Sequence, residues 1–260
     1  MIDTHAHLAD PVFDADRAAV LERARQAGIT GIVLVGETLA DARRNLELAA
    51  GDALLHPAAG LYPAHLDLAQ AEAMVGFIRE HRTELVAIGE VGLDHWLAKE
   101  ARDRQLQEVI LARFIDLSLE LDLPLNVHSR SAGRAAVELL LQRGARRVQM
   151  HAFDAKPGAA AAAVEAGFFF SIPPSVVHSR QKRRLVQALP LERLLLETDS
   201  PVLGPRPGER NEPANAAGVL AVIAELKGLD QATVRAALAR NTRRLYGGKL
   251  ADVGDSGVPD

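Results

Sequence analysis

The chain has 260 residues, of which 48% are hydrophobic and 25% are charged, and its formal net charge is −4. This composition is that of an ordinary globular protein, and the length suits one domain with a large core. The charge excludes a broad basic surface for nucleic acid or anionic lipid, and the absence of cysteine excludes disulfides and thiolate ligands. No segment reaches the roughly 18 apolar residues of a membrane span, and the first residues do not resemble a signal peptide. We therefore expect a cytoplasmic protein.

Short runs of branched apolar residues recur along the chain and predict eight strands. In chain order these are Met1–His5, Ile29–Val35, Leu54–Ala59, Leu85–Gly89, Leu125–His128, Val148–His151, Phe168–Ile172 and Leu194–Thr198. Segments with helical periodicity lie between and after them, at Asp16–Ala27, Ala40–Ala50, Ala69–His81, Gln105–Leu121, Ala132–Gln142, Gly158–Ala166, Arg180–Ala188, Ala214–Leu226 and Thr233–Leu245.

The alternation of strands and helices predicts a parallel sheet, and eight such units predict closure into an α/β fold, the (β/α)8 barrel of TIM type. An open, doubly wound sheet is the alternative, but no Gly-x-Gly-x-x-Gly motif follows a predicted strand. We expect a single barrel domain over residues 1–250. Residues 251–260 contain Gly, Asp, Ser and Pro and are expected to form a flexible tail.

Six potential metal ligands lie at or just after the ends of predicted strands. They are His5 and His7 at the first strand, Glu90 after the fourth, His128 and His151 at the fifth and sixth, and Asp199 after the eighth. Since the carboxyl ends of barrel strands meet on one face, these side chains are expected to converge there. One histidine alone is easily explained as a core residue, but six chelating groups at matching positions indicate a metal site.

Four imidazoles and two carboxylates exceed the three protein ligands of a single catalytic ion, so we expect two divalent ions. Glu90 is expected to bridge them, with one ion held by His5, His7 and Asp199 and the other by His128 and His151. Such a pair lowers the pKa of bound water and stabilises the attacking and leaving oxygens of a phosphodiester. Asp199 either binds metal and also accepts the proton of the attacking water, or it is a metal ligand only. Zinc, magnesium and manganese all remain open, because imidazole suits the first and carboxylate the other two.

Six motifs resemble those of the TatD-type metal-dependent deoxyribonucleases of the amidohydrolase superfamily. They are Asp3-Thr-His5-Ala-His7, Ala87-Ile-Gly-Glu90-Val-Gly-Leu-Asp94, Asn126-Val-His128-Ser-Arg130, His151-Ala-Phe153, Leu196-Glu-Thr-Asp199-Ser-Pro201 and Asn241-Thr-Arg-Arg-Leu-Tyr246. The resemblance extends over nearly the whole chain. It implies a (β/α)8 barrel, a divalent-metal centre and magnesium- or manganese-supported cleavage of DNA, often by removal of nucleotides from a 3′ end.

One position departs from the family pattern. The family commonly has Gly-x-His-Pro after the third strand, whereas this chain has Gly60-Leu-Tyr62-Pro63. A phenol donates hydrogen bonds well but is a poor proton acceptor near pH 7, because its pKa is about 10. His65 is a candidate to replace the missing histidine. We expect four residues to contact the substrate. They are Tyr62, His65, Arg130 and Arg206, and the two arginines are included because arginines near strand ends can bind phosphate.

Two other functions remain open from the sequence. A metal centre can also direct water onto carbon, so an aminoacyl-tRNA deacylase or a small-molecule amidohydrolase is the first alternative. A noncatalytic, metal-containing nucleic-acid-binding protein is the second. In the preferred function DNA is the substrate and Glu90 and Asp199 are catalytic, and we expect a monomer with no protein partner and no membrane contact.

Overall fold

The computed structural model describes residues 1–250, in which eight parallel strands alternate with helical segments. The strands are β1 (Ile2–Ala6), β2 (Gly31–Leu34), β3 (Leu55–Ala59), β4 (Ala87–Gly92), β5 (Leu125–His128), β6 (Val148–Met150), β7 (Phe169–Ile172) and β8 (Leu194–Leu196). Each strand pairs with the next in the chain, and a parallel bridge between Ala6 and Ser200 joins the segment after β8 to β1. The prediction of a (β/α)8 barrel is confirmed. The predicted flexible tail, residues 251–260, lies outside the described residues.

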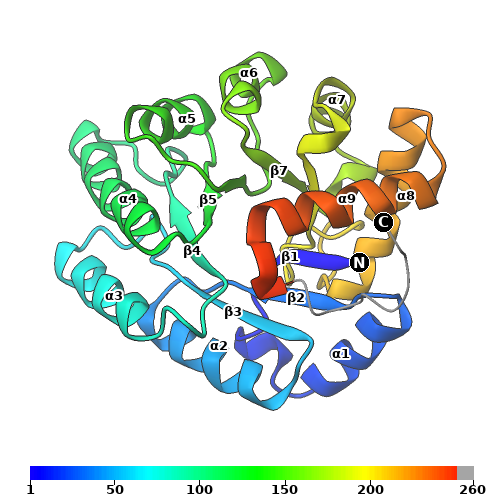
Figure 1. Cartoon of the computed structure of the whole chain (residues 1–260), viewed down its shortest axis with the longest axis horizontal. Helices are drawn as coiled ribbons and strands as arrows, with labels where there is room; N and C mark the ends of the chain where they lie inside the picture. The colour runs from blue at the N-terminus through cyan, green and yellow to red at the C-terminus, as the bar shows by residue number, and fades with distance from the viewer. Residues whose placement is uncertain (251–260) are drawn as a thin grey trace.

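Helices α1 to α8 surround the strands, and α9 lies across one end of the barrel (Figure 1). They are α1 (Arg17–Gln26), α2 (Leu39–Gly51), α3 (Leu68–Glu80), α4 (Ala101–Leu121), α5 (Gly133–Gln142), α6 (Pro157–Glu165), α7 (Arg180–Ala188), α8 (Ala216–Lys227) and α9 (Gln231–Tyr246). Several begin at side chains that accept from free backbone N–H groups. Asp230, for example, accepts from Thr233 N at 2.8 Å and starts α9.

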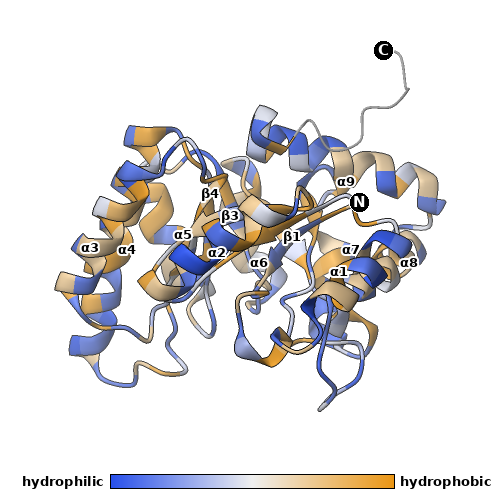
Figure 2. Cartoon of the chain, turned by 90° about the horizontal axis from the view of Figure 1, so that it is seen from below, coloured by the Kyte–Doolittle hydropathy of each residue, from blue (hydrophilic) through white to orange (hydrophobic). Residues whose placement is uncertain are grey.

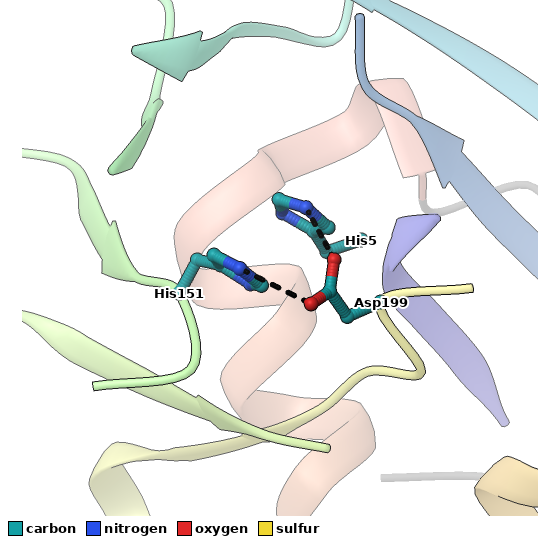
Figure 3. A group of neighbouring side chains, drawn as sticks. All are labelled: His5, His151 and Asp199. Atoms are coloured by element: carbon teal, nitrogen blue, oxygen red, sulfur yellow. Dashed lines mark ion pairs between the residues drawn. The ribbon is translucent and has the colours of Figure 1, made fainter. Parts of the chain in front are cut away.

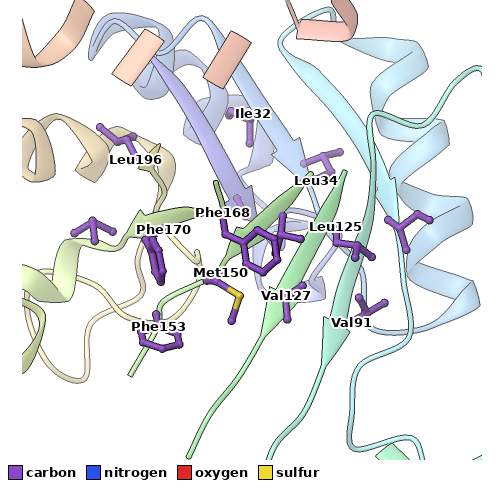
Figure 4. Close-up of a cluster of buried hydrophobic side chains, with 14 of the residues drawn as sticks. Ile32, Leu34, Val91, Leu125, Val127, Met150, Phe153, Phe168, Phe170 and Leu196 are labelled. Carbon is purple, nitrogen blue, oxygen red and sulfur yellow. The ribbon is translucent and has the colours of Figure 1, made fainter. Parts of the chain in front are cut away.

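Strand side chains alternate between the inside of the barrel and the layer under the helices. The outer layer is large and apolar, and Leu34, Leu125, Val127 and Phe170 are completely buried in it (Figure 4). Burial of each such side chain stabilises the fold by roughly 1.5–3 kcal/mol. In Figure 2 the surrounding helices carry both hydrophilic and hydrophobic residues, as expected when one helix face packs on the barrel and the other meets solvent.

The alternate strand positions form a smaller buried cluster that includes Val33, Phe169 and Leu195. Tyr246 of α9 joins this cluster, and its hydroxyl donates a 2.6 Å hydrogen bond to Gln149 Oε1. Helix α9 therefore closes the amino-terminal end of the barrel. At the carboxyl end of the barrel, the inner strand positions carry polar side chains instead.

The observed boundaries differ most from the predicted ones at β4. This strand continues to Gly92, so Glu90 lies within it rather than after it, because Val91 and Gly92 pair with β5 beyond a register irregularity. Helix α4 begins at Ala101, one turn before the predicted start. Among the helices of residues 1–250, none combines the length and the apolar character needed to span a membrane.

Candidate metal centre

His5 lies at the carboxyl end of β1 and His7 directly follows the strand. Their Nε2 atoms lie 3.1 Å apart, and His5 is completely buried. The two-residue spacing produces this convergence because alternate strand positions share one side. The two imidazoles therefore lie side by side, as the spacing in the sequence predicts.

Asp199 reaches the same point from the segment after β8. Its backbone N–H donates to His5 O at 2.8 Å, and its φ of 56° lies in the left-handed region. Asp199 Oδ1 is 3.4 Å from His5 Nε2, and Oδ2 is 3.7 Å from His151 Nε2 (Figure 3). A left-handed backbone is uncommon for a residue other than glycine, and such conformations concentrate at functional sites.

Glu90 lies between two groups of histidines. Its Oε2 is 3.4 Å from His7 Nε2 and 3.9 Å from His5 Nε2. Its Oε1 is 2.7 Å from His128 Nδ1 and 3.9 Å from His151 Nε2. Each carboxylate oxygen therefore faces a different pair of imidazoles, as a bridging carboxylate must.

The backbone of Glu90 is held in place by a close approach of β3 and β4. A Cβ atom added to Gly60 would lie 2.5 Å from the carbonyl oxygen of Glu90, which is too close for any side chain. Glycine at position 60 is thus required for Glu90 to sit at this depth in the barrel mouth.

Three of the histidines use their second ring nitrogen to contact a buried acceptor. His5 Nδ1 lies 2.9 Å from Asn126 Oδ1, His128 Nε2 lies 3.0 Å from Asp94 Oδ2, and His151 Nδ1 lies 2.9 Å from Glu197 Oε2. The Asn126 oxygen is assigned as the acceptor because its amide nitrogen donates to Thr4 O at 3.0 Å. A proton held on this outer nitrogen leaves the lone pair of the other nitrogen directed at the cluster, which is the tautomer that a metal ligand needs.

The donor set fits divalent ions. Three groups of potential ligand atoms, in each of which all atoms lie within 4.8 Å of one another, are His5, His151 and Asp199; His5, His7 and Glu90; and Glu90, His128 and His151. Imidazole nitrogens combined with carboxylate oxygens suit zinc, manganese or magnesium, and the outer hydrogen bonds are those of a metal site.

The charges of the site explain how the ionised groups are tolerated inside the barrel. Burial disfavours a charge on His5, but Asp199 and Glu90 raise its pKa to about 10. Burial also disfavours the charged form of Glu90, yet the adjacent imidazoles, led by His128, hold its pKa below the usual range. Protonated imidazoles and ionised carboxylates therefore stabilise one another, and a bound cation would exchange with those protons.

A cavity of about 470 Å³ opens over this cluster. Tyr62 and Arg130, two of the four residues expected to contact the substrate, line this cavity. The Tyr62 hydroxyl donates to Asp94 Oδ2 at 3.3 Å, and burial with the nearby acids raises its pKa, so the phenol stays protonated. His65 and Arg206 are not among the lining residues; Arg206 Nη1 instead lies 3.3 Å from a Glu209 oxygen on the surface.

Sequence reasoning missed three contributors to this site. Asp94 and Asn126 occur in the quoted motifs, but only the structure shows that each orients a histidine. The charged run Gln181-Lys-Arg-Arg184 is typical of a solvated helix face, whereas Lys182 lines the cavity. Its position at the start of the helix after β7 was the available signal, because that turn faces the carboxyl end of the barrel.

Comparison with known proteins identifies the family of this chain. The family of TatD-related DNases matches residues 2–247. The chain belongs to this family. Human deoxyribonuclease TATDN3 is 40% identical to it over 258 residues, which cover 95% of this chain and 94% of that protein.

Two further TatD relatives are similar along the same span. The crystal structure of the TatD homologue YJJV from Escherichia coli has a TM-score of 0.88 and 30% identity, covering 95% of this chain and 97% of its own. TatD of Mycobacterium tuberculosis, described as an uncharacterized metal-dependent hydrolase, is 33% identical over 263 residues, covering 95% of this chain and 98% of that protein. The resemblance inferred from the six motifs is confirmed.

Proposed function

We propose that this protein hydrolyses phosphodiester bonds of DNA at a centre of two divalent ions. Membership of the TatD-related DNase family supports a hydrolase acting on ester bonds. The observation that carries the proposal is the position of Glu90, whose two oxygens face separate pairs of histidines. The ligands would be His5, His7, Glu90, His128, His151 and Asp199.

In this proposal Glu90 would be a ligand of both ions, and His5 and His7 lie on one side of it. A bound pair of divalent ions would supply Lewis-acid stabilisation of phosphoryl oxygens and would acidify water. His128 and His151 lie on the other side, and Asp94 and Glu197 keep their proton-bearing nitrogens turned outward. The protein contributes a fixed set of lone pairs that does not have to reorganise when substrate binds.

Asp199 is proposed to accept the proton of the attacking water. Both of its oxygens face the cluster, and the adjacent imidazoles hold its pKa well below the usual range despite burial, so the carboxylate is ionised and available. Tyr62 is proposed to turn its single O–H from Asp94 to a substrate oxygen rather than to take a proton, since its phenol remains protonated.

An exposed aromatic ring stacked against a cavity-lining arginine supports a nucleic-acid substrate. Trp96, the only tryptophan, is 51% exposed, and the guanidinium carbon of Arg130 lies 3.8 Å from the centre of its ring. Exposed aromatic rings beside cationic groups stack on unpaired bases and contact the backbone. A small amide substrate would need no such platform. We therefore propose single-stranded DNA, or an unpaired 3′ end, as the substrate.

The test is cleavage of oligodeoxynucleotides labelled at either end by protein loaded separately with zinc, magnesium or manganese. Stepwise loss from the 3′ end is expected, with activity reduced at least about 100-fold in Glu90→Gln. Glu225→Gln, a change at an exposed glutamate that pairs with Arg183, is the matched control and should retain activity. Turnover of an aminoacyl ester without cleavage of DNA would replace the proposal with the deacylase alternative. Binding of DNA without any turnover would support the noncatalytic one.

A further inference from the structure

Lys182 departs from the solvated helix face to which its neighbours belong. It lies in the first turn of α7, where Ser179 Oγ accepts from its backbone N–H at 3.3 Å. Its side chain is partly buried and lines the cavity above the metal ligands. The Nζ atom donates a 3.2 Å hydrogen bond to the carbonyl oxygen of Ala152, the residue that follows His151. The ammonium group is thereby held at the edge of the proposed metal centre.

Most of the hydrogen-bonding capacity of this ammonium group is unused. An ammonium has three N–H donors, and the bond to Ala152 uses one of them. The next residue, Arg183, forms an ion pair with Glu225 at 2.6 Å, whereas no carboxylate oxygen in the described part of the chain lies within 4.0 Å of Lys182 Nζ. Donors that protein groups do not take are available to an anion that enters the cavity.

We propose that Lys182 binds a non-bridging oxygen of the substrate phosphodiester and so helps the site to select a charged phosphate linkage. The inference rests on the proposed nuclease function and names a recognition group for the substrate at the same site. An ammonium group suits this task because it acts as a point charge on phosphate oxygens. Arg130 reaches the same cavity from the loop after β5, so one cationic group approaches it from that loop and another from the start of α7. The opposing explanation is that Lys182 only balances the charge of the nearby acids Asp154, Glu197 and Asp199.

The experiment measures binding of a short single-stranded oligonucleotide with phosphorothioate linkages, which keep the charge and resist cleavage, to metal-loaded protein at several salt concentrations. Lys182→Met is expected to weaken binding about 10-fold or more and to reduce the slope of log K against log salt by about 0.7, the value for one lost phosphate contact on a single strand. Lys182→Arg should restore the slope. Arg184→Met, which changes an exposed residue of the same helix, should match the wild type.

Metal content and melting temperature are measured for every variant. Wild-type affinity and slope in Lys182→Met would overturn the inference, and so would a loss of binding fully explained by reduced metal content. If the wild-type protein neither binds nor cleaves DNA, the proposed nuclease function fails. Binding of inorganic phosphate to the wild type and to Lys182→Met is then compared to test the role of Lys182. Weaker phosphate binding by Lys182→Met would then support it as an anion-binding residue, and equal binding would overturn that role.

Discussion

Replacement of Glu197 by glutamine is expected to disturb the metal centre through a single buried side chain. Glu197 Oε2 faces His151 Nδ1 at 2.9 Å, and Oε1 accepts from the backbone N–H of Ala152 at 3.0 Å. The side chain is completely buried, so water cannot replace either contact. Glutamine offers one acceptor oxygen and one amino group and can satisfy only one of these two donors.

Either orientation of the glutamine amide has a cost. If the amino group faces His151, the imidazole must accept at Nδ1 and carry its proton on Nε2, the nitrogen that lies 3.7 Å from Asp199. If the amino group faces Ala152, a buried backbone donor loses its partner, which costs roughly 1–3 kcal/mol. We expect metal affinity to fall about 10- to 100-fold, the usual effect of changing a group that orients a ligand.

The assay is calorimetric titration of metal into chelator-treated protein, together with thermal unfolding. Glu225→Gln is again the control, because its exposed ion pair with Arg183 contributes at most about 1 kcal/mol and touches no ligand. Wild-type metal affinity and an unchanged melting temperature in Glu197→Gln would refute the reasoning that Glu197 fixes the proton position on His151.

Three other predictions concern metal, pH and the fold. Chelation should lower the melting temperature, and an ion restored at 100 times its Kd should return about 2.7 kcal/mol; an unchanged melting temperature contradicts a resident ion. Because acids near His128 and His5 raise their pKa values, despite burial, to about 9 and about 10, metal binding at pH 8 should release protons, and affinity should rise with pH up to that range. Titration in buffers of different ionisation enthalpy measures this release, and its absence would count against these imidazoles as ligands. Asn241→Ala should lower the free energy of unfolding by roughly 1–3 kcal/mol, because it removes two 2.8 Å hydrogen bonds to the carbonyls of Leu191 and Leu194. A wild-type urea midpoint would contradict that value.

The barrel and the six clustered groups could be predicted because both depend on strand parity and strand ends. His5 and His7 share a side of β1 whatever the loops do, and every carboxyl end meets the same face. The exact depth of Glu90 could not be predicted, because it follows from an irregular register between β4 and β5.

The directions of side chains outside the strands were harder to predict. Arg206 and Lys182 are both basic residues near the carboxyl face, but Arg206 is drawn to Glu209 on the surface whereas Lys182 turns inward to Ala152. Such directions depend on partners supplied by tertiary structure, which a local pattern does not encode. The outer acceptors Asp94 and Asn126 were hidden for the same reason, since each meets its histidine across different strands or loops.

The seam between the first and last strands also limits when this chain can become active. His7 N donates to Ser200 O and Asp199 N donates to His5 O, both at 2.8 Å, so the proposed ligands from the two ends are brought together by the same contacts that close the ring. A nascent chain still lacking its eighth strand would hold an incomplete set of ligands, however well its earlier units had formed. The hydrogen bonds that close the ring are therefore also the ones that place Asp199 beside His5 and His7.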